Sequence, residues 1–239
     1  MDNNLNNKKS ILDKAIDVFR SNRYIKIISF VLLGVVTTLF VFYLAISLWE
    51  KKNSFSVMVS SYGLNINNEE NKGIITLSLD SNFTSPSTHI DCEGISGLNN
   101  ISVLDIPLNI DEIDGEHNGK NYIALTFYLK NIGNAGIIRD SVLINNCYRG
   151  VDEAIRVGVY RNGIYTQYAK LNKDGENEYN SIGFFSSDVV CSNEHYLETN
   201  EVVKYTIVIW LEGDDPECTD HLFGGFINMS MEFNVINSE

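Results

Sequence analysis

The sequence predicts an all-β fold, an antiparallel β-sandwich of jelly-roll or immunoglobulin-like type, preceded by a single transmembrane helix. Beyond Lys52, apolar and polar residues alternate with a period of two over many short segments that turn residues separate. Before it, residues 27–49 form a run without charge or proline. We therefore expect three parts: a cytoplasmic leader 1–26, a transmembrane segment 27–49 and an extracytoplasmic β-sandwich domain 50–239.

The run IISFVLLGVVTTLFVFYLAISLW is long enough to cross a ~30 Å hydrocarbon core at ~1.5 Å per residue. Residues 1–26 carry six lysines and arginines, whereas Lys51 and Lys52 are the two cations directly after the run. The positive-inside rule then places the N-terminus in the cytoplasm and the rest of the chain outside. The run is longer than the apolar part of a usual signal peptide, which favours a retained anchor. Cleavage before Leu48 is the alternative.

Two segments show the strand periodicity most clearly. In YIALTFYLKN the apolar side chains Ile123, Leu125, Phe127 and Leu129 fall on one face. The segment INMSMEFNV repeats this pattern with apolar residues at every second position from Ile227. We expect both apolar faces to point into one core.

Other segments complete the predicted strand set. Asn162-Gly163 lies between two alternating runs and predicts a hairpin, because a type I′ turn needs positive φ at both positions. VVKYTIVIWLE is apolar on both faces, as expected of a central strand covered on both sides. Residues 151–155 suit a helical turn. Weaker strand patterns occur at residues 55–61, 73–79, 100–110, 140–147 and 181–185.

An alternating strand that ends in Asn-x-Gly, here Asn131 and Gly133, precedes a C-terminal unit of strand, acidic loop, glycines and strand, Trp210 to Phe233. With the apolar leader, this arrangement resembles the TasA/camelysin family of Gram-positive bacteria, over the last half of the chain above all. The resemblance implies a secreted jelly-roll domain that builds biofilm matrix fibres by passing a strand between subunits. The leader lacks that family's cleavage pattern, and four cysteines are unusual in it.

Residues 53–239 hold ten cations and 27 acids, a formal charge of −17. Nucleic-acid binding needs clustered lysine and arginine, so the composition argues against a nucleic-acid partner. It argues equally against docking on anionic lipid. A surface of this charge is compatible with divalent cations outside the cell.

The stretch WLEGDDPECTD gathers carboxylates where a predicted strand ends. Hard oxygen ligands of this kind suit Ca²⁺, although the EF-hand spacing is absent. A solvated loop and a pair of catalytic carboxylates are the alternatives. The candidate calcium ligands are Glu212, Asp214, Asp215, Glu217 and Asp220.

All four cysteines follow the apolar run, so an oxidising location would permit two disulfides. We expect the pairs Cys191–Cys218 and Cys92–Cys147. Four free buried cysteines are the alternative.

The sequence contains no H-E-x-x-H helix, G-x-S-x-G elbow, Walker loop or dinucleotide fingerprint. We therefore expect the protein to have no enzymatic activity. The expected function is a cell-surface structural or assembly protein that is anchored in the membrane or secreted, forms fibres or matrix, and has its own copies or another surface protein as partner. The alternative is a membrane-anchored extracellular binding module, stabilised by calcium.

Overall fold

The computed structural model describes residues 2–49, 52–60 and 75–236. The chain divides into two compact units, residues 1–50 and residues 51–239. The first unit is one helix, α1 (Asp2–Trp49), so the leader is helical as well as the apolar run. Within α1, Tyr24–Ile46 is long and apolar enough to span a membrane.

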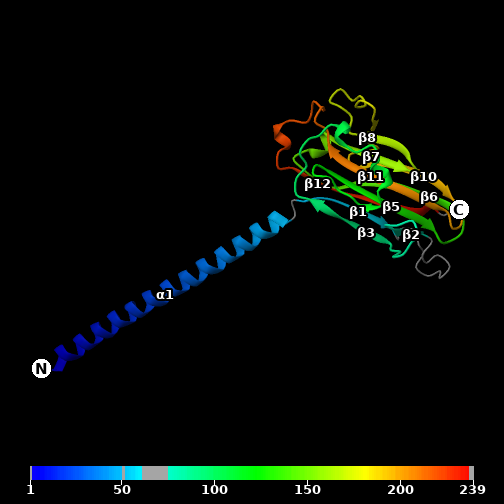
Figure 1. Ribbon diagram of the computed structural model, residues 1–239. Helices are drawn as coiled ribbons and strands as arrows, with labels where there is room; N and C mark the ends of the chain where they lie inside the picture. The colour runs from blue at the N-terminus through cyan, green and yellow to red at the C-terminus, as the bar shows by residue number, and fades with distance from the viewer. Residues whose placement is uncertain (1, 50–51, 61–74, 237–239) are drawn as a thin grey trace. The chain divides into compact units, whose positions relative to one another are not determined.

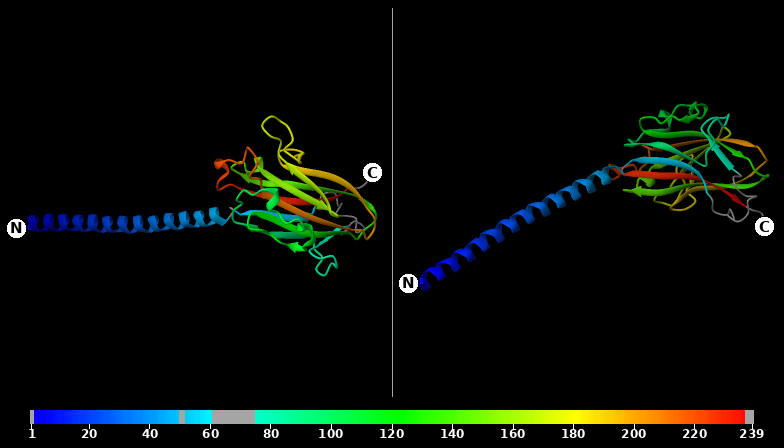
Figure 2. Two further views of the ribbon diagram at one scale, coloured as in Figure 1. Left: turned by 45° about the horizontal axis from the view of Figure 1, so that its top comes forward. Right: turned by 90° about the horizontal axis from the view of Figure 1, so that it is seen from below.

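The second unit is a sandwich of two β-sheets, which confirms the predicted fold (Figure 1). The two sheets lie face to face, as the turned views in Figure 2 show. In the part of the chain that the structure describes, the first sheet has the order β10 (Val189–Leu197), β6 (Gly136–Tyr148), β12 (Phe226–Ile236), β1 (Asn53–Val59), β3 (His89–Ile95). The second has the order β2 (Ile75–Ser78), β5 (Tyr122–Asn131), β11 (Val202–Leu211), β7 (Ile155–Arg161), β8 (Ile164–Ala169), β9 (Ile182–Gly183), with β4 (Gly115–Glu116) also on β5.

Strand pairing is mostly antiparallel, as predicted, but two pairs among the described strands are parallel. β1 runs parallel to β12, with Phe55 opposite Met229 and Val57 opposite Met231. The two strands lie near opposite ends of the chain, so no tight hairpin forces them to be antiparallel. β8 and β9 form the second parallel pair.

The main core lies between the sheets and confirms the predicted faces. Ile123, Leu125, Phe127 and Leu129 are buried from β5, and Ile227, Met229, Met231 and Phe233 are buried from β12. The ring of Phe127 stacks on Tyr205 at 5.5 Å and meets the edge of Phe233 at 6.0 Å. An aromatic cluster therefore joins the two sheets.

A smaller core lies on the outer face of the second sheet. Val208 and Trp210 of β11 are buried there with Ala124 and Ile110. β11 is thus covered on both faces, as predicted, and the outer cover comes from a connecting segment. That segment includes two short 3-10 turns, η2 (Val103–Asp105) and η3 (Ile110–Glu112).

The strand predicted at residues 100–110 is therefore wrong, apart from one bridge between Ile101 and Glu212. Pro107 has no backbone N–H for a ladder, and the Ser102 hydroxyl caps η2.

The remaining local predictions are mostly confirmed. Asn162 and Gly163 have φ of 50° and 79° and join β7 to β8. The predicted helical turn is η4 (Val151–Glu153), and another 3-10 turn, η5 (Asp220–Leu222), precedes β12. Two predicted strands extend beyond the described residues, the first (55–61) at residue 61 and the second (73–79) at residues 73–74.

Candidate functional site

The candidate site is built around Arg156, which lies near the start of β7. Arg156 alternates with the core residues Ile155 and Val157, so its side chain leaves the opposite face of the sheet. The guanidinium is nevertheless buried, with 4% of the side chain exposed. A buried guanidinium costs several kcal/mol unless carboxylates pair with it. This position therefore needs acids nearby.

Two connections supply those acids because they leave the sheet at the same end. Arg156 lies opposite Trp210, next to the end of β11, and opposite Ala169, at the end of β8. The connection after β11, residues 212–225, brings Asp215 and Glu217. The connection after β8, residues 170–181, brings Glu178.

A tight turn sets the direction of the two acids in the 212–225 connection. The backbone N–H of Glu217 donates to Asp215 Oδ1 at 2.7 Å, and the N–H of Cys218 donates to the Asp215 carbonyl at 2.9 Å. Turns in which an Asp side chain accepts from the backbone two residues on are favoured locally. As a result Asp215 and Glu217 both turn inward, with 0% and 10% of their side chains exposed.

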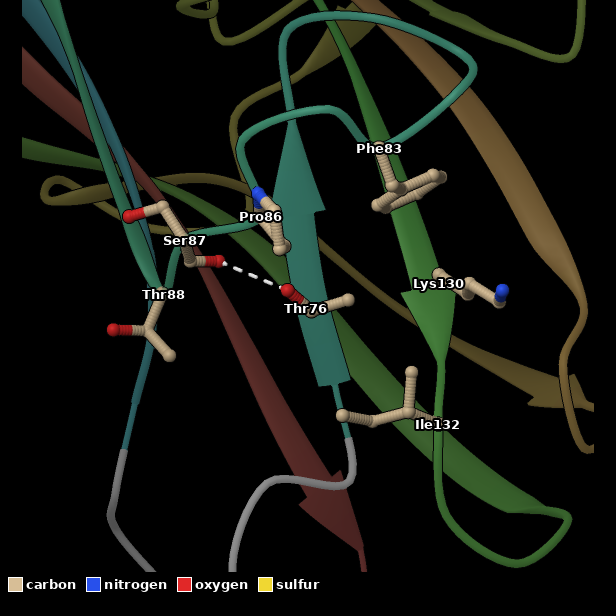
Figure 3. A pocket seen from close by; sticks show the side chains of 7 residues that line it. All are labelled: Thr76, Phe83, Pro86, Ser87, Thr88, Lys130 and Ile132. Carbon is tan, nitrogen blue, oxygen red and sulfur yellow. Dashed lines mark hydrogen bonds between the residues drawn. The ribbon is translucent and has the colours of Figure 1, made fainter.

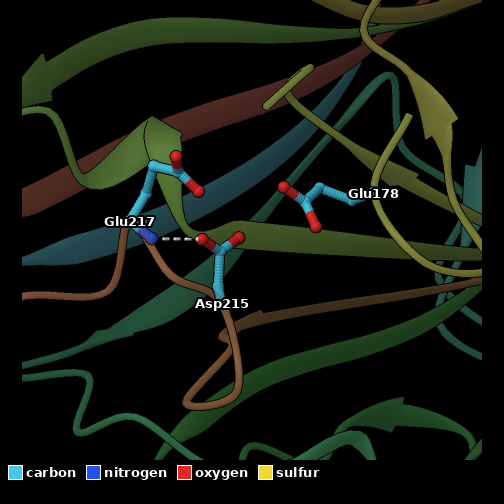
Figure 4. Close-up of side chains that lie close together, drawn as sticks. All are labelled: Glu178, Asp215 and Glu217. Atoms are coloured by element: carbon cyan, nitrogen blue, oxygen red, sulfur yellow. Dashed lines mark hydrogen bonds between the residues drawn. The ribbon is translucent and has the colours of Figure 1, made fainter. Parts of the chain in front are cut away.

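Three carboxylates converge at this point (Figure 4). One oxygen each from Glu178, Asp215 and Glu217 can be chosen so that all three lie within 4.8 Å of one another. Glu178 enters from the opposite side to the other two and has 13% of its side chain exposed. The cluster therefore links two connections that are far apart in sequence.

Positive charge offsets this cluster in part. Arg156 Nη2 lies 2.7 Å from Asp215 Oδ2 and 3.4 Å from Glu178 Oε2. Lys173 Nζ lies 3.5 Å from Glu217 Oε1, but 75% of the lysine side chain is exposed, so water screens this pair. The buried groups thus carry one positive and three negative charges. Glu217 Oε2 is buried and accepts no hydrogen bond from any described residue.

The crowding affects proton binding. Burial raises the pKa of Glu178, and repulsion from Asp215 raises it further, against the lowering effect of Arg156. Burial also raises the pKa of the Cys218 thiol, with contributions from Asp215 and Glu212. A thiol that stays protonated is a poor metal ligand, so the cluster offers hard carboxylate oxygens.

The structure brings together only part of the predicted calcium set. Glu212 is buried, but its Oε2 accepts from the indole Nε1–H of Trp210 at 2.9 Å. Asp214 and Asp220 are exposed. Asp215 and Glu217 remain, and they are joined by Glu178 and Arg156, which the sequence reasoning missed. An arginine inside an apolar alternating strand was the available signal for Arg156. Glu178 lies in a polar loop and gave none.

All four cysteines are free in the structure, so neither predicted disulfide is formed. Cys92 on β3 and Cys147 on β6 are separated by β1 and β12 in the sheet. Three strand spacings are about 14 Å, whereas the Cα atoms of a disulfide lie within about 7 Å. Cys191, on β10, lies beside Tyr168 and Asp140. Cys218 lies beside Asp215.

A second polar cluster lies between the sheets. Asp140 of β6 is buried, and its Oδ1 lies 3.2 Å from His195 Nε2 on β10. The Arg161 Nε–H donates to the hydroxyl of Tyr205 at 3.2 Å, and both groups influence Asp140. Burial raises the pKa of Asp140, whereas His195 and Arg161 act to lower it. These groups form a structural polar network, in which the Asp140 carboxylate has fewer hydrogen bonds than it can accept.

An open groove lies beside β2 (Figure 3). It has a volume of about 640 Å³. Phe83, Pro86 and Ile132 give it apolar walls, and Lys130 Nζ lies 5.7 Å from the centre of the Phe83 ring. The Thr76 hydroxyl donates to the Ser87 carbonyl at 3.4 Å across its floor. This groove therefore offers a ligand one cationic group, Lys130, and apolar walls.

Comparisons with known proteins assign no family to this chain. No family model matches it, and no curated protein matches it. Among solved structures it is similar to a β-glucosidase from Kluyveromyces marxianus in complex with glucose, with 12% identity and a TM-score of 0.23. The match covers 79% of this chain and 18% of the β-glucosidase chain. A score at this level supports neither a shared fold nor a shared activity.

Proposed function

We propose that the chain is a cell-surface structural or assembly protein anchored in the membrane. In this proposal α1 crosses the membrane with its N-terminus in the cytoplasm, and the acidic sandwich lies outside the cell. The apolar stretch Tyr24–Ile46 and the six cations before residue 27 support it. The proposal includes no catalytic role.

The observation that carries the assembly role is the outer edge of β10 in the first sheet, where residues 191–196 pair with no further strand in the described part of the chain. At the start of the strand, the carbonyls of Val189 and Val190 accept from the N–H groups of Ser186 and Phe185. β10 is the outermost strand of that sheet and pairs with β6 on one side. An edge strand presents backbone N–H and C=O groups that can pair with a strand of another chain. Glu194 and Tyr196 are exposed along it.

The opposite edge of that sheet is protected. The N–H of Glu93 on β3 donates to Glu116 Oε2 at 2.9 Å, and the Glu93 carbonyl accepts from Asn118 Nδ2 at 2.9 Å. Side chains thus take up polar groups that a new strand would need. β10 is therefore the edge at which we place the neighbour.

The resemblance to the TasA/camelysin family supports a further step, in which the neighbours are copies of this chain and the product is a fibre or matrix. β1 fits such a role. It lies between β12 and β3, and its Phe55 and Val57 are 1% and 0% exposed in the core. In this step a strand from a neighbouring chain takes the place of β1 in the sheet.

The test is self-association of the purified chain in detergent, followed by analytical ultracentrifugation and electron microscopy. We expect polymers that grow with concentration, and we expect Tyr196→Lys to reduce them because a lysine on an edge strand opposes strand addition. Tyr179→Lys is the matched control, since Tyr179 is exposed outside the strands. A monomer at all concentrations, or equal polymerisation of the Tyr196→Lys variant, would contradict the proposal.

A second candidate function is an extracellular binding module. A hollow of about 410 Å³ between residues 96–100 and 218–225 favours it. Asn99 and Asn100 line this hollow and offer amide donors and acceptors. A chain that stays monomeric but whose melting temperature rises with a small polar ligand would favour this module over assembly.

A further inference from the structure

We propose that Glu178, Asp215 and Glu217 form a binding site for one divalent cation that prefers oxygen ligands, Ca²⁺ foremost. The bound ion would fasten the connection 170–181 to the connection 212–225. This inference does not depend on the proposed assembly role, since it concerns the stability of the sandwich itself.

The geometry fits one ion. Calcium lies about 2.3–2.6 Å from its oxygen ligands, so two ligands on opposite sides of it are about 4.8 Å apart. The three carboxylate oxygens all lie within 4.8 Å of one another, so a point between them lies no more than about 2.8 Å from each, and a small inward movement of the side chains brings all three to calcium distance. Carboxylates often bind through both oxygens, and water would supply the ligands that the protein does not.

Glu217 is the second and independent observation. Its side chain is nine-tenths buried, yet Oε2 has no hydrogen-bond partner among the described residues. Arg156 is directed at Asp215 and Glu178, and Lys173 approaches the other oxygen of Glu217, Oε1. A buried carboxylate oxygen without a partner is costly. A cation bound at Oε2 removes this cost.

The charge balance points to a divalent ion. Three carboxylates and one guanidinium leave a net charge of −2 on the buried groups. Arg156 holds Asp215 Oδ2 in place, and carboxylate oxygens have further lone pairs for a metal. A divalent ion neutralises the remaining charge without displacing the arginine.

Binding to the folded state alone stabilises it by RT ln(1 + [L]/Kd). At a hundred times Kd this corresponds to a rise in melting temperature of about 5–10 °C for a domain of this size. The experiment is thermal unfolding of the full chain in detergent, in CaCl₂, in MgCl₂ and in EGTA. Calorimetric titration should find one Ca²⁺ per chain, bound more tightly than Mg²⁺.

Two variants make the test specific. Glu217→Gln and Glu178→Gln keep the shape of the side chain, and each should abolish the calcium-dependent shift. In EGTA both should melt no lower than the wild type, because each removes one charge from a crowded cluster. Asp214→Asn is the matched control from the same loop and should retain the full shift, since Asp214 is exposed.

Equal melting of the wild type in calcium and chelator, with no calorimetric binding, overturns the proposal. A calcium shift that survives in Glu217→Gln and Glu178→Gln overturns it as well, because the ion would then bind elsewhere. If both variants melt lower than the wild type in EGTA, and calcium shifts neither the variants nor the wild type, the cluster is an ion-pair network that needs all its charges, and the proposal is wrong.

Discussion

Asp140 is an acid whose surroundings oppose its charge. It is 2% exposed in β6, and the charged or ionisable groups that face it are His195 from β10, Arg161 from β7 and Tyr205 from β11. Cys191 and Tyr168 lie close by as well. Burial outweighs the lowering effects of His195 and Arg161 and raises the pKa of Asp140 above its ordinary value of 3.8.

The raised pKa gives a definite sign to the pH dependence. The folded state holds this proton more tightly than the unfolded state, so the free energy of unfolding falls as the pH rises from about 3.8 through the folded-state pKa. Asp140→Asn keeps the shape and cannot ionise. We expect urea unfolding between about pH 4 and pH 7 to show a smaller fall for this variant.

Asp188→Asn is the control for that measurement, because Asp188 is exposed and its carboxylate forms no ion pair among the described residues. Its pH profile should follow the wild type. If Asp140→Asn also follows the wild type, the charge on Asp140 is fully compensated in the fold, and our account of its surroundings is wrong.

At the scale of an element, the β7–β8 hairpin depends on two positive φ angles. Gly163 has φ of +79°, and an added Cβ would meet one atom at 4.0 Å, Asp111 Oδ2. Space is therefore available, and the cost of a side chain there is a backbone cost. L-residues in this left-handed region cost about 1–2 kcal/mol.

We therefore expect Gly163→Ala to lower the free energy of unfolding by about 1–2 kcal/mol, measured by chemical denaturation. Gly136→Ala is the matched control, because Gly136 begins β6, has no atom within 4 Å of an added Cβ and needs no positive φ. Its effect should stay within about 0.5 kcal/mol. Equal losses in the two variants would show that the turn conformation is not what Gly163 provides.

At the scale of the whole molecule, an apolar helix and an acidic sandwich divide the chain into parts suited to different solvents. The helix has every backbone N–H and C=O group bonded within itself, apart from its ends, which is the condition for crossing a bilayer. The sandwich buries its main apolar core between its sheets and a smaller one outside the second sheet, and it carries its net negative charge in water.

The proposed orientation predicts which end of the chain is accessible on intact cells. An epitope tag after Glu239 should bind an impermeant antibody, and the same tag before Met1 should bind it only after permeabilisation. The reason is the excess of lysine and arginine before the apolar run. Surface labelling of the N-terminal tag, without the C-terminal one, would reverse the orientation. Loss of the N-terminal tag from the mature protein would indicate cleavage.

The sequence by itself determined the fold class and the main apolar faces. Alternation with a period of two is a local property, so Phe127 and Phe233 could be assigned to the core without knowing which strands pair. The Asn162-Gly163 turn is local in the same way. So is the helix, since its length and apolar composition lie in one continuous stretch.

The tertiary structure alone decided the candidate site, the free cysteines and the parallel pairing of β1 with β12. Each of these depends on which distant segments meet. Glu178 reaches Asp215 across a separation of 37 positions in the sequence, and the reason is that β8 and β11 end on the same side of Arg156. The acidic loop could be recognised in the sequence, but the tertiary structure decided which of its five acids belong to the site. Asp215 pairs with the buried guanidinium of Arg156, which needs a carboxylate beside it, and Glu217 lies close to Asp215.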